Sequence, residues 1–209
     1  MARIAAEVAG PVLDWGCGHG QVSALLQAAG VEVVSLEWDP DAAPGDVRTP
    51  PRHPEVRVRL TPDAVALPFD AASFDAVLSM GVLEHVQDPD GSLEEIRRVL
   101  RPGGTLYVFK LPNRRSYLEW VARRAGLYYH GSLPDDRVYT LRQARELVER
   151  HGFDVVEARR ANMLPLTLTG RWARRHARAV WRANVALARV PLLHRLATNV
   201  ELVARPRSP

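Results

Sequence analysis

A glycine-rich turn directly after a short buried strand is the feature that most constrains how this 209-residue chain can fold. Residues 11–15 read Pro-Val-Leu-Asp-Trp, and Gly16, Gly18 and Gly20 follow before a helical pattern over 21–29. Glycine adopts positive φ and lets a ligand approach the main chain closely, and the helix that follows offers free N–H groups to an anionic ligand. The turn indicates either a nucleotide-binding loop or a purely structural one.

Strands and helices alternate after this turn, which predicts a parallel sheet with crossover helices. Six further strands are expected, over residues 31–37, 56–60, 74–79, 105–110, 153–160 and 199–205. Further helices are expected over 93–100, 116–125, 140–152 and 171–189.

Two regions that normally help to cover a bound nucleotide are reduced in this sequence. Between the second and third strands stand five prolines, which favour a loop over a helix; they are Pro40, Pro44, Pro50, Pro51 and Pro54. Almost nothing precedes the first strand. We therefore expect another segment to cover the site.

Charge is divided unevenly along the chain, whose formal net charge is +4. Residues 1–110 hold 9 basic and 16 acidic side chains, a net of −7, whereas residues 111–209 hold 19 and 8, a net of +11. The basic half indicates either a surface for an anionic partner or solvated arginine-rich helices. The single cysteine, Cys17, and the lack of an apolar run of about 18 residues favour a cytoplasmic protein of one domain.

Glu37 ends the second strand 17 residues after Gly20, where a carboxylate can accept hydrogen bonds from both hydroxyls of a ribose. A solvent-facing glutamate is the alternative. The dinucleotide fingerprint is Gly-x-Gly-x-x-Gly, but here the third glycine comes one position earlier and Asp14 precedes the turn. An acid at Asp14 suits an amino group better than a pyrophosphate.

Five segments stand in a characteristic order: Val-Leu-Asp-Trp-Gly-Cys-Gly-His-Gly over 12–20, Val-Val-Ser-Leu-Glu over 33–37, Asp-Ala-Val-Ala-Leu-Pro-Phe over 63–69, Ser-Phe-Asp-Ala-Val-Leu-Ser over 73–79 and Arg-Val-Leu-Arg-Pro-Gly-Gly over 98–104. This order resembles the class I methyltransferases that use S-adenosylmethionine (SAM), most closely the small-molecule branch that includes the ubiquinone-biosynthesis O-methyltransferases. The resemblance implies an α/β fold, a Rossmann-like doubly wound seven-stranded sheet that is mostly parallel with an antiparallel last strand. It also implies one domain over 1–209, with insertions at about 112–139 and 164–196.

The resemblance assigns the cofactor site residue by residue. The adenosine part of SAM would be held by Glu37 at the ribose hydroxyls, Trp38 against the adenine face, Asp63 at the adenine amino group and the Ala64 backbone at the ring edge. The methionine part would lie on the glycine turn and the end of the fourth strand, formed by Asp14, Gly16, Gly18, Gly20, Ser79 and Met80. Asp14 would orient the ammonium group, directly or through water.

Glu84 and His85 follow the fourth strand, and His85 is the candidate general base for a hydroxyl nucleophile. The alternative is a structural histidine near the cofactor. In the ubiquinone branch a further glutamate is thought to join this pair as a metal ligand, but Gly81 stands at that position here. Two ligands make a weak site for a divalent ion, so no metal is expected.

The acceptor should be bound by segments outside the common core. Aromatic side chains around a cleft suit a flat or apolar acceptor, and the candidates are Tyr128, Tyr129, His130 and Tyr139. The basic helix expected over 171–189 is interpreted as a lid, with a membrane-surface helix as the alternative.

The sequence therefore predicts transfer of a methyl group from SAM to a small molecule, at oxygen, by a monomer or homodimer. A nucleic-acid partner is not expected, whereas peripheral membrane contact stays open. Alternative hypotheses are a lipid-linked or macromolecular acceptor, a non-catalytic SAM-fold subunit and a nicotinamide-dependent oxidoreductase. The glycine spacing and Asp63 argue against the oxidoreductase.

Overall fold

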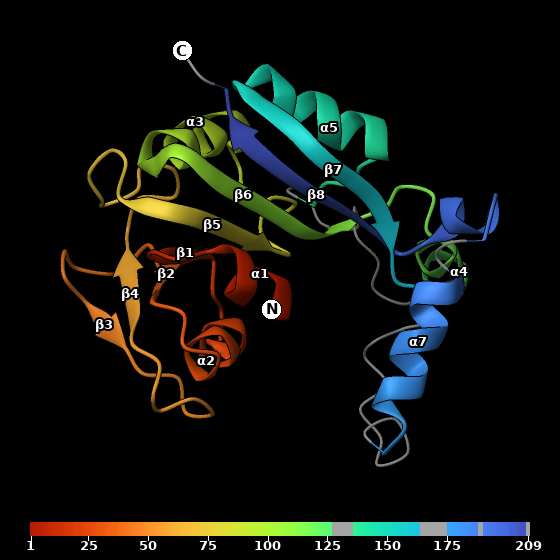
Figure 1. Ribbon diagram of the computed structural model, residues 1–209, viewed down its shortest axis with the longest axis horizontal. Helices are drawn as coiled ribbons and strands as arrows, with labels where there is room; N and C mark the ends of the chain where they lie inside the picture. Colours follow the sequence, from red (N-terminus) through yellow and green to blue (C-terminus); the bar gives the residue numbers. More distant parts are fainter. Residues whose placement is uncertain (127–135, 164–174, 188–189, 208–209) are drawn as a thin grey trace.

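The computed structural model describes residues 1–126, 136–163, 175–187 and 190–207. They form an eight-stranded sheet in the order β3-β4-β2-β1-β5-β6-β8-β7, with helices on both faces (Figure 1). β4, β2, β1, β5 and β6 run parallel, and β8 runs antiparallel to both β6 and β7. The expected mixed α/β sheet with an antiparallel last strand is confirmed.

The strands are β1 (Val12–Trp15), β2 (Val33–Trp38), β3 (Val47–Arg48), β4 (Val58–Thr61), β5 (Phe74–Met80), β6 (Leu100–Pro112), β7 (Phe153–Ala161) and β8 (Asn199–Pro206). The helices are α1 (Ala2–Glu7), α2 (Gln21–Ala28), α3 (Pro89–Val99), α4 (Tyr117–Arg124), α5 (Leu141–Arg150) and α7 (Ala177–Leu187), with a 3₁₀ turn η1 (Leu193–Leu196). Side chains set several helix starts: Asp88 caps α3 through Gly91 N–H, and Thr140 and Gln143 form a capping box on α5.

Strand residues alternate between two apolar layers, as the period-2 geometry of a strand requires. Leu13, Trp15 and Val77 point into the layer that α3 and α5 cover. Val12 and Leu78 point into the opposite layer, which receives apolar side chains from α1 and α2. The sheet is therefore a rigid scaffold whose strand ends hold the loops in place.

The eighth strand was not expected from the sequence. β3 pairs antiparallel with β4 at the outer edge of the sheet, and no helix forms between β2 and β4, as the prolines predict. The segment before β1, for which no element was predicted, forms the short helix α1. Glu7 of α1 accepts a hydrogen bond of 3.0 Å from the Tyr107 hydroxyl of β6, so α1 is fixed to the sheet.

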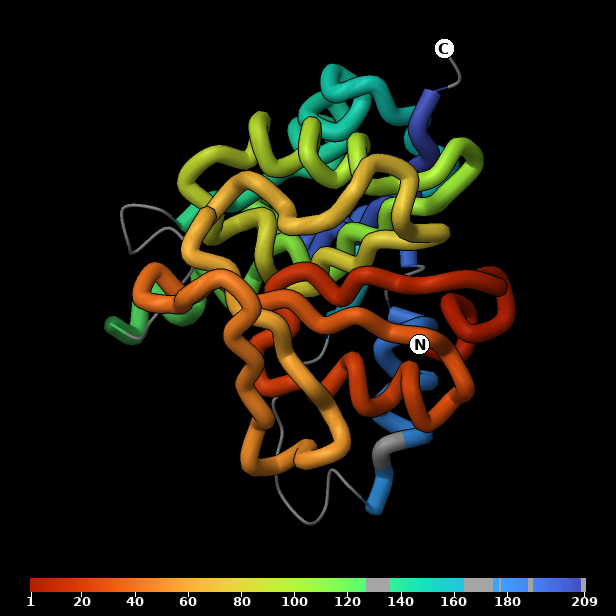
Figure 2. The backbone as a smooth tube through the Cα atoms, turned by 90° about the vertical axis from the view of Figure 1, so that its left-hand side faces the viewer, coloured from red at the N-terminus to blue at the C-terminus, as the bar shows by residue number. Residues whose placement is uncertain are grey.

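The segments after β6 and β7 lie together on one side of the molecule. α4 and α7 both lie beyond the carboxyl-terminal ends of β6 and β7 (Figure 1), and Figure 2 shows α4 in green at one end of that side and α7 in blue toward the other. Of the basic helix expected over 171–189, the described part is helical over Ala177–Leu187. None of the helices in the described ranges is both long and apolar enough to cross a bilayer.

Candidate active site

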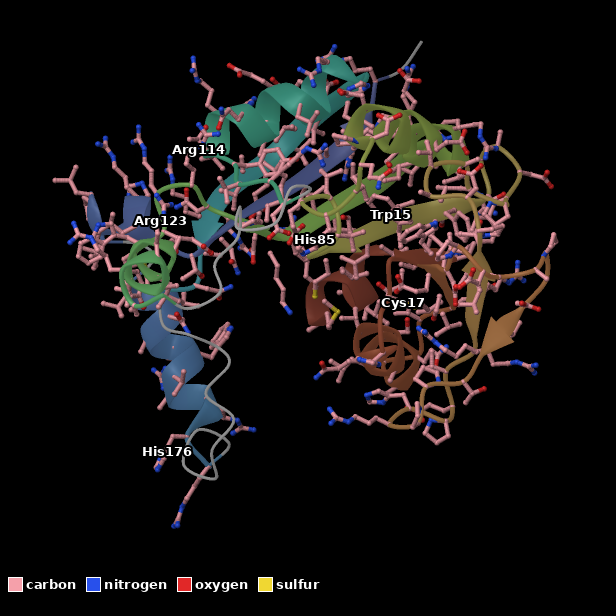
Figure 3. The ribbon with its side chains drawn as sticks, turned by 180° about the vertical axis from the view of Figure 1, so that it is seen from behind. Trp15, Cys17, His85, Arg114, Arg123 and His176 are labelled. Carbon is pink, nitrogen blue, oxygen red and sulfur yellow. The ribbon has the colours of Figure 1, made fainter. Side chains whose placement is uncertain are left out.

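A cavity of about 360 Å³ opens at the carboxyl-terminal ends of β1, β2 and β4. Such edges are where ligands bind in open α/β sheets. The lining residues come from the glycine turn, the strand ends and the loop after β5: Trp15, Gly16, Leu36, Glu37, Trp38, Thr61, Asp63, Ala64, Leu67, Val82, His85, Val86 and Gln87. Six of them were candidates from the sequence, namely Gly16, Glu37, Trp38, Asp63, Ala64 and His85. Figure 3 shows Trp15 and His85 close together in the middle of the molecule.

The glycine turn adopts a backbone that other residues rarely tolerate. Gly16, Gly18 and Gly20 have φ of 68°, 55° and 72°, in the left-handed region that favours glycine. A Cβ on Gly16 would stand 2.6 Å from the Val82 side chain, whereas a Cβ on Gly18 would meet nothing within 4 Å. The turn therefore leaves open space at Gly18, although Gly18 and Gly20 are not among the residues that line the cavity.

Glu37 links the second strand to this turn. Its Oε2 accepts a hydrogen bond of 2.5 Å from Gly18 N–H, and its carboxylate also lines the cavity. Among the described residues, the bonds to this carboxylate use Oε2, so Oε1 is available to a ligand hydroxyl. Arg48 donates to the Gly18 carbonyl at 3.0 Å, a contact that sequence reasoning missed.

Asp63 and Trp38 also line the cavity. Asp63 Oδ1 accepts backbone N–H bonds of 2.8 Å from both Val65 and Ala66, which lower the pKa of this carboxyl group. It is therefore ionised at neutral pH and can accept from an amino group. The Trp38 indole donates to the Pro62 carbonyl at 3.1 Å, and half of the side chain stays exposed, so its ring is fixed and still free to stack.

Asp14, Ser79 and Met80 lie outside the cavity lining. Asp14 is buried, and its carboxylate accepts a hydrogen bond of 2.6 Å from the Ser23 hydroxyl. The Ser23 hydroxyl in turn accepts a hydrogen bond of 2.7 Å from the Ser35 hydroxyl. Burial raises the pKa of Asp14 to about 6. Ser79 is buried beside Trp15, and no described residue bonds its hydroxyl. Asp14 thus lies beneath the turn, and its assignment to the SAM ammonium stays a prediction.

His85 is held by a residue that sequence reasoning missed. Its Nδ1 lies 2.9 Å from Oδ1 of Asp136, whose side chain is only 3% exposed, and its Nε2 lies 4.0 Å from Glu84 Oε1. A carboxylate at Nδ1 favours the tautomer with its proton there, which leaves Nε2 as the acceptor. In the sequence, Asp136 is marked only by its place beside the aromatic segment that was expected to bind the acceptor.

Residues 136–138, here called the strap, are hydrogen-bonded to the loop after β5 and carry Asp136. Arg137 N–H donates 2.9 Å to the Glu84 carbonyl, and its guanidinium donates to the carbonyls of Val86 and Gln87. Val86 and Gln87 line the cavity. Arg137 therefore holds Asp136 against His85 through three backbone contacts.

Glu84 is a buried acid below this pair. It is 2% exposed, and no described residue bonds its Oε2. Burial raises the pKa of Glu84 to about 7, partly offset by His85 and Lys110. Protonated at Oε2, the side chain would be a hydrogen-bond donor near the His85 imidazole.

The raised pKa of Glu84 predicts that the Glu84→Gln variant gains unfolding free energy relative to wild type as the pH rises. Because the folded-state pKa is raised, the protein is stabilised by protonated Glu84 below the ordinary pKa of about 4.3 and loses that contribution as pH rises through about 7. Glutamine cannot ionise, so relative to wild type the variant should gain about 1–3 kcal/mol of unfolding free energy between pH 5 and pH 8. Urea denaturation across this range measures the gain, with Glu55→Gln as an exposed control. A difference between variant and wild type that does not change with pH would contradict the assignment.

The structure separates Tyr139 from the cavity. Tyr139 is 8% exposed and packs in the core between β6 and α5, beside a second hollow that also contacts Arg114 and Arg150. Its role in acceptor binding stays a prediction. The other candidates for acceptor binding, Tyr128, Tyr129 and His130, lie outside the described residues.

No group of three metal-ligating side chains occurs within the described ranges. Gly81 has φ of 72°, and a Cβ there would stand 3.5 Å from Glu84 Oε1. A glutamate at Gly81 would therefore be strained. The expectation of no metal stays a prediction.

Cys17 lies in the glycine turn and is partly buried. Burial, and then the charges of Asp14 and Glu37, raise the pKa of its thiol, so the thiolate needed for nucleophilic chemistry is scarce at neutral pH. We expect Cys17→Ser to bind SAM and turn over at the wild-type level, measured by calorimetry and product formation. A folded variant that binds SAM but has lost turnover would show that the thiol takes part.

Comparison with known proteins agrees with this geometry. A family model described as a methyltransferase domain matches residues 13–108. An uncharacterized methyltransferase of Mycolicibacterium gilvum is 30% identical over 206 residues, covering 93% of this chain and 76% of the relative. A ubiquinone biosynthesis O-methyltransferase of Ruegeria pomeroyi is 35% identical over 160 residues, covering 68% of this chain and 62% of the relative.

A solved structure shares the fold. The 1,6-didemethyltoxoflavin-N1-methyltransferase of Burkholderia thailandensis, with 1,6-didemethyltoxoflavin and S-adenosylhomocysteine bound, has a TM-score of 0.58 at 20% identity and covers 99% of this chain and 76% of that one. The sheet, the site at its carboxyl edge and these relatives define a class of protein: the chain belongs to the class I SAM-dependent methyltransferases.

Proposed function

We propose that this enzyme methylates a hydroxyl of a small, flat or apolar molecule, with His85 as the general base. The observation that supports this most is the pair formed by His85 and Asp136. The imidazole lines the cavity and is oriented by a nearly buried carboxylate. A phenol is the class of acceptor that such a base would activate.

The cavity fits SAM in size and in chemistry. Pockets for ligands of this size measure about 300–1,000 Å³, and this one measures about 360 Å³. Glu37 offers carboxylate oxygen to ribose hydroxyls, and Asp63 offers it to the adenine amino group, with Trp38 beside them. The open space at Gly18 lets the methionine part lie against the turn. When bound, SAM supplies a methyl group activated by its sulfonium.

The residues of the chain would then position the acceptor and remove its proton. His85 Nε2 takes the proton of the hydroxyl while the oxygen bonds to the methyl carbon and the carbon–sulfur bond breaks. The products are the methyl ether, S-adenosylhomocysteine and an imidazolium. Asp136 stabilises the imidazolium charge. General-base help of this kind contributes roughly 100- to 10,000-fold to a rate.

The lid assigned to the second insertion stays part of the proposal. α7 lies on the carboxyl-edge side of the sheet (Figure 1), and its Asn184 side chain accepts 2.7 Å from Met163 N–H. Of its described residues, none lines the cavity. Within the described part of the chain, the strap at 136–138, which belongs to the first insertion, contacts the loop after β5 that lines the cavity.

The test is turnover of SAM with a set of acceptors that differ in the nucleophile. Phenols, catechols, amines and thiols of similar size are each incubated with enzyme and methyl-labelled SAM, and mass spectrometry locates the methyl group. The proposal requires phenols or catechols to react fastest. Preferential methylation of amines, or S-adenosylhomocysteine release that no acceptor stimulates, would refute it.

A further inference from the structure

The segment between Glu157 and Glu201 contains no acidic residue and nine arginines: Arg159, Arg160, Arg171, Arg174, Arg175, Arg178, Arg182, Arg189 and Arg195. It includes α7 and η1, which with α4 form the side of the molecule beyond the ends of β6 and β7. α4 adds Arg123 and Arg124 and one acid, Glu119. Of the described arginines, Arg178 and Arg182 lie in α7 and Arg195 lies in η1, so positive charge is concentrated beyond the ends of β6 and β7.

Exposed apolar side chains gather on the same three elements. Of the eleven large hydrophobic residues exposed in the described ranges, seven belong to α4, α7 and the turn around η1. They are Trp120, Val121, Trp181, Val190, Leu192, Leu193 and Leu196, and the most exposed are Leu192 at 68% and Trp181 at 64%. Exposed apolar side chains gathered on neighbouring elements in this way indicate an interaction site.

Backbone and side-chain contacts join these elements into one surface, here called the arginine–leucine face and defined by α4, α7 and residues 190–196. Met163 links the two helices, since its N–H donates to Asn184 of α7 and its carbonyl accepts 2.5 Å from the Tyr117 hydroxyl of α4. Leu196 and Trp120 line one hollow of about 400 Å³. Figure 3 shows Arg114, Arg123 and His176 along this side, away from Cys17.

Three arginines lie near this face, and one of them, Arg115, lines the same hollow as Trp120 and Leu196. Arg115 follows β6, Arg160 lies in β7, and Arg195 lies in η1. The backbone carbonyl of Arg195 accepts a hydrogen bond of 3.0 Å from the Asn113 side chain. Burial, and then the charges of Arg115 and Arg195, lower the pKa of Arg160. No hydrogen bond or ion pair joins these three guanidinium groups to a carboxylate of the described residues. Like charges held together in this way would be stabilised by an external anion.

We propose that the arginine–leucine face docks on the surface of an anionic lipid bilayer. Arginines would meet lipid phosphates, while the exposed tryptophans and leucines would enter the interface, where aromatic rings and leucine side chains partition favourably. A nucleic acid would use the arginines but leave four exposed leucine and valine side chains at 190–196 unburied. A second copy of the chain would bring two strongly basic faces together.

The bilayer also fits the position of the face. α4 and α7 lie beyond the carboxyl-terminal ends of β6 and β7 (Figure 1), and the cavity opens at the same edge of the sheet, at the ends of β1, β2 and β4. An enzyme docked in this way would take an apolar acceptor from the membrane surface. That last point alone rests on the proposed function, whereas bilayer docking does not.

Vesicle flotation tests the docking. Full-length protein is mixed with vesicles of phosphatidylcholine alone or of phosphatidylcholine with phosphatidylglycerol, and bound protein is measured after centrifugation. We expect binding to the phosphatidylglycerol vesicles and little to the neutral ones. Arg115→Glu with Arg195→Glu should weaken binding roughly thirtyfold, because each basic residue contributes about fivefold near an anionic surface. Trp181→Ser with Leu192→Ser should weaken it at both low and high salt.

Matched controls place the effect on this face. Arg52→Glu changes an exposed arginine between β3 and β4, and Leu25→Ser changes an exposed leucine of α2. Both variants should bind vesicles like wild type. Circular dichroism and SAM binding check that each variant is folded. Absence of binding to anionic vesicles, or equal losses in the control variants, would overturn the proposal. So would tighter binding to a single-stranded RNA oligomer, or a dimer in light scattering that Trp181→Ser dissociates.

Discussion

Glu37→Ala should weaken SAM binding at least about 100-fold while the protein stays folded. A carboxylate that accepts from two ribose hydroxyls makes two charge-assisted hydrogen bonds, each worth about 1.5–3 kcal/mol. The substitution also removes the acceptor of the Gly18 N–H bond, which would leave the glycine turn less fixed. Both effects act on cofactor binding, so the dissociation constant measured by calorimetry is the direct readout.

Two variants separate charge from shape at this position. Glu37→Gln keeps an acceptor oxygen and should recover part of the affinity. Glu55→Ala removes an exposed carboxylate outside the cavity lining and should leave the affinity unchanged. An unchanged dissociation constant in Glu37→Ala, with a wild-type unfolding temperature, would remove Glu37 from the cofactor site.

His85→Ala should lower the rate constant kcat at least about 100-fold, because it removes the general base. The dissociation constant for SAM should change little, since Glu37 and Asp63 remain. The measurement is methylation of catechol, or of the phenol that wild-type enzyme methylates fastest, followed by S-adenosylhomocysteine release. An imidazole that only packs beside the cofactor would affect SAM affinity rather than kcat.

Asp136→Asn tests how His85 is held. An amide at Nδ1 can stabilise either tautomer and cannot stabilise an imidazolium, so kcat should fall while the SAM affinity is kept. The loss should be smaller for acidic phenols, which need less help from a base. Equal losses for acidic and weakly acidic phenols would assign Asp136 a purely structural role in the strap.

The candidate residues that line the cavity could be placed there from the sequence because they are local to strand ends and to the glycine turn. The glycine turn follows a strand directly, and Glu37 ends the neighbouring strand. Their meeting at one edge follows from parallel β1–β2 pairing. Asp63 follows β4, and it lies at the same edge because β4 pairs in parallel with β2. The alternation of buried and exposed residues in a strand and the positive φ of a glycine turn each depend on a few neighbouring residues, so they can be predicted from the sequence.

The surroundings of His85 could not be predicted in the same way. Asp136 lies 51 residues further along the chain, and its contact depends on Arg137 bonding to three carbonyls of the loop after β5. Backbone carbonyls are present at every residue, so no sequence pattern identifies the ones that Arg137 selects. Asp14 also depended on the fold, since Ser23 and Ser35 surround it beneath the turn.

The sequence by itself determined the α/β class, the parallel core of β1, β2, β4, β5 and β6, and the placement of Glu37 and Asp63 at strand ends beside the cavity, because each depends on local periodicity or on the order of neighbouring strands. Only the tertiary structure decided which acid orients His85, that Tyr139 packs in the core, and that the arginines of three separate elements share one face with exposed leucines. Those relations join residues far apart in sequence, and they are set by the packing of β6, β7 and β8 rather than by any local preference.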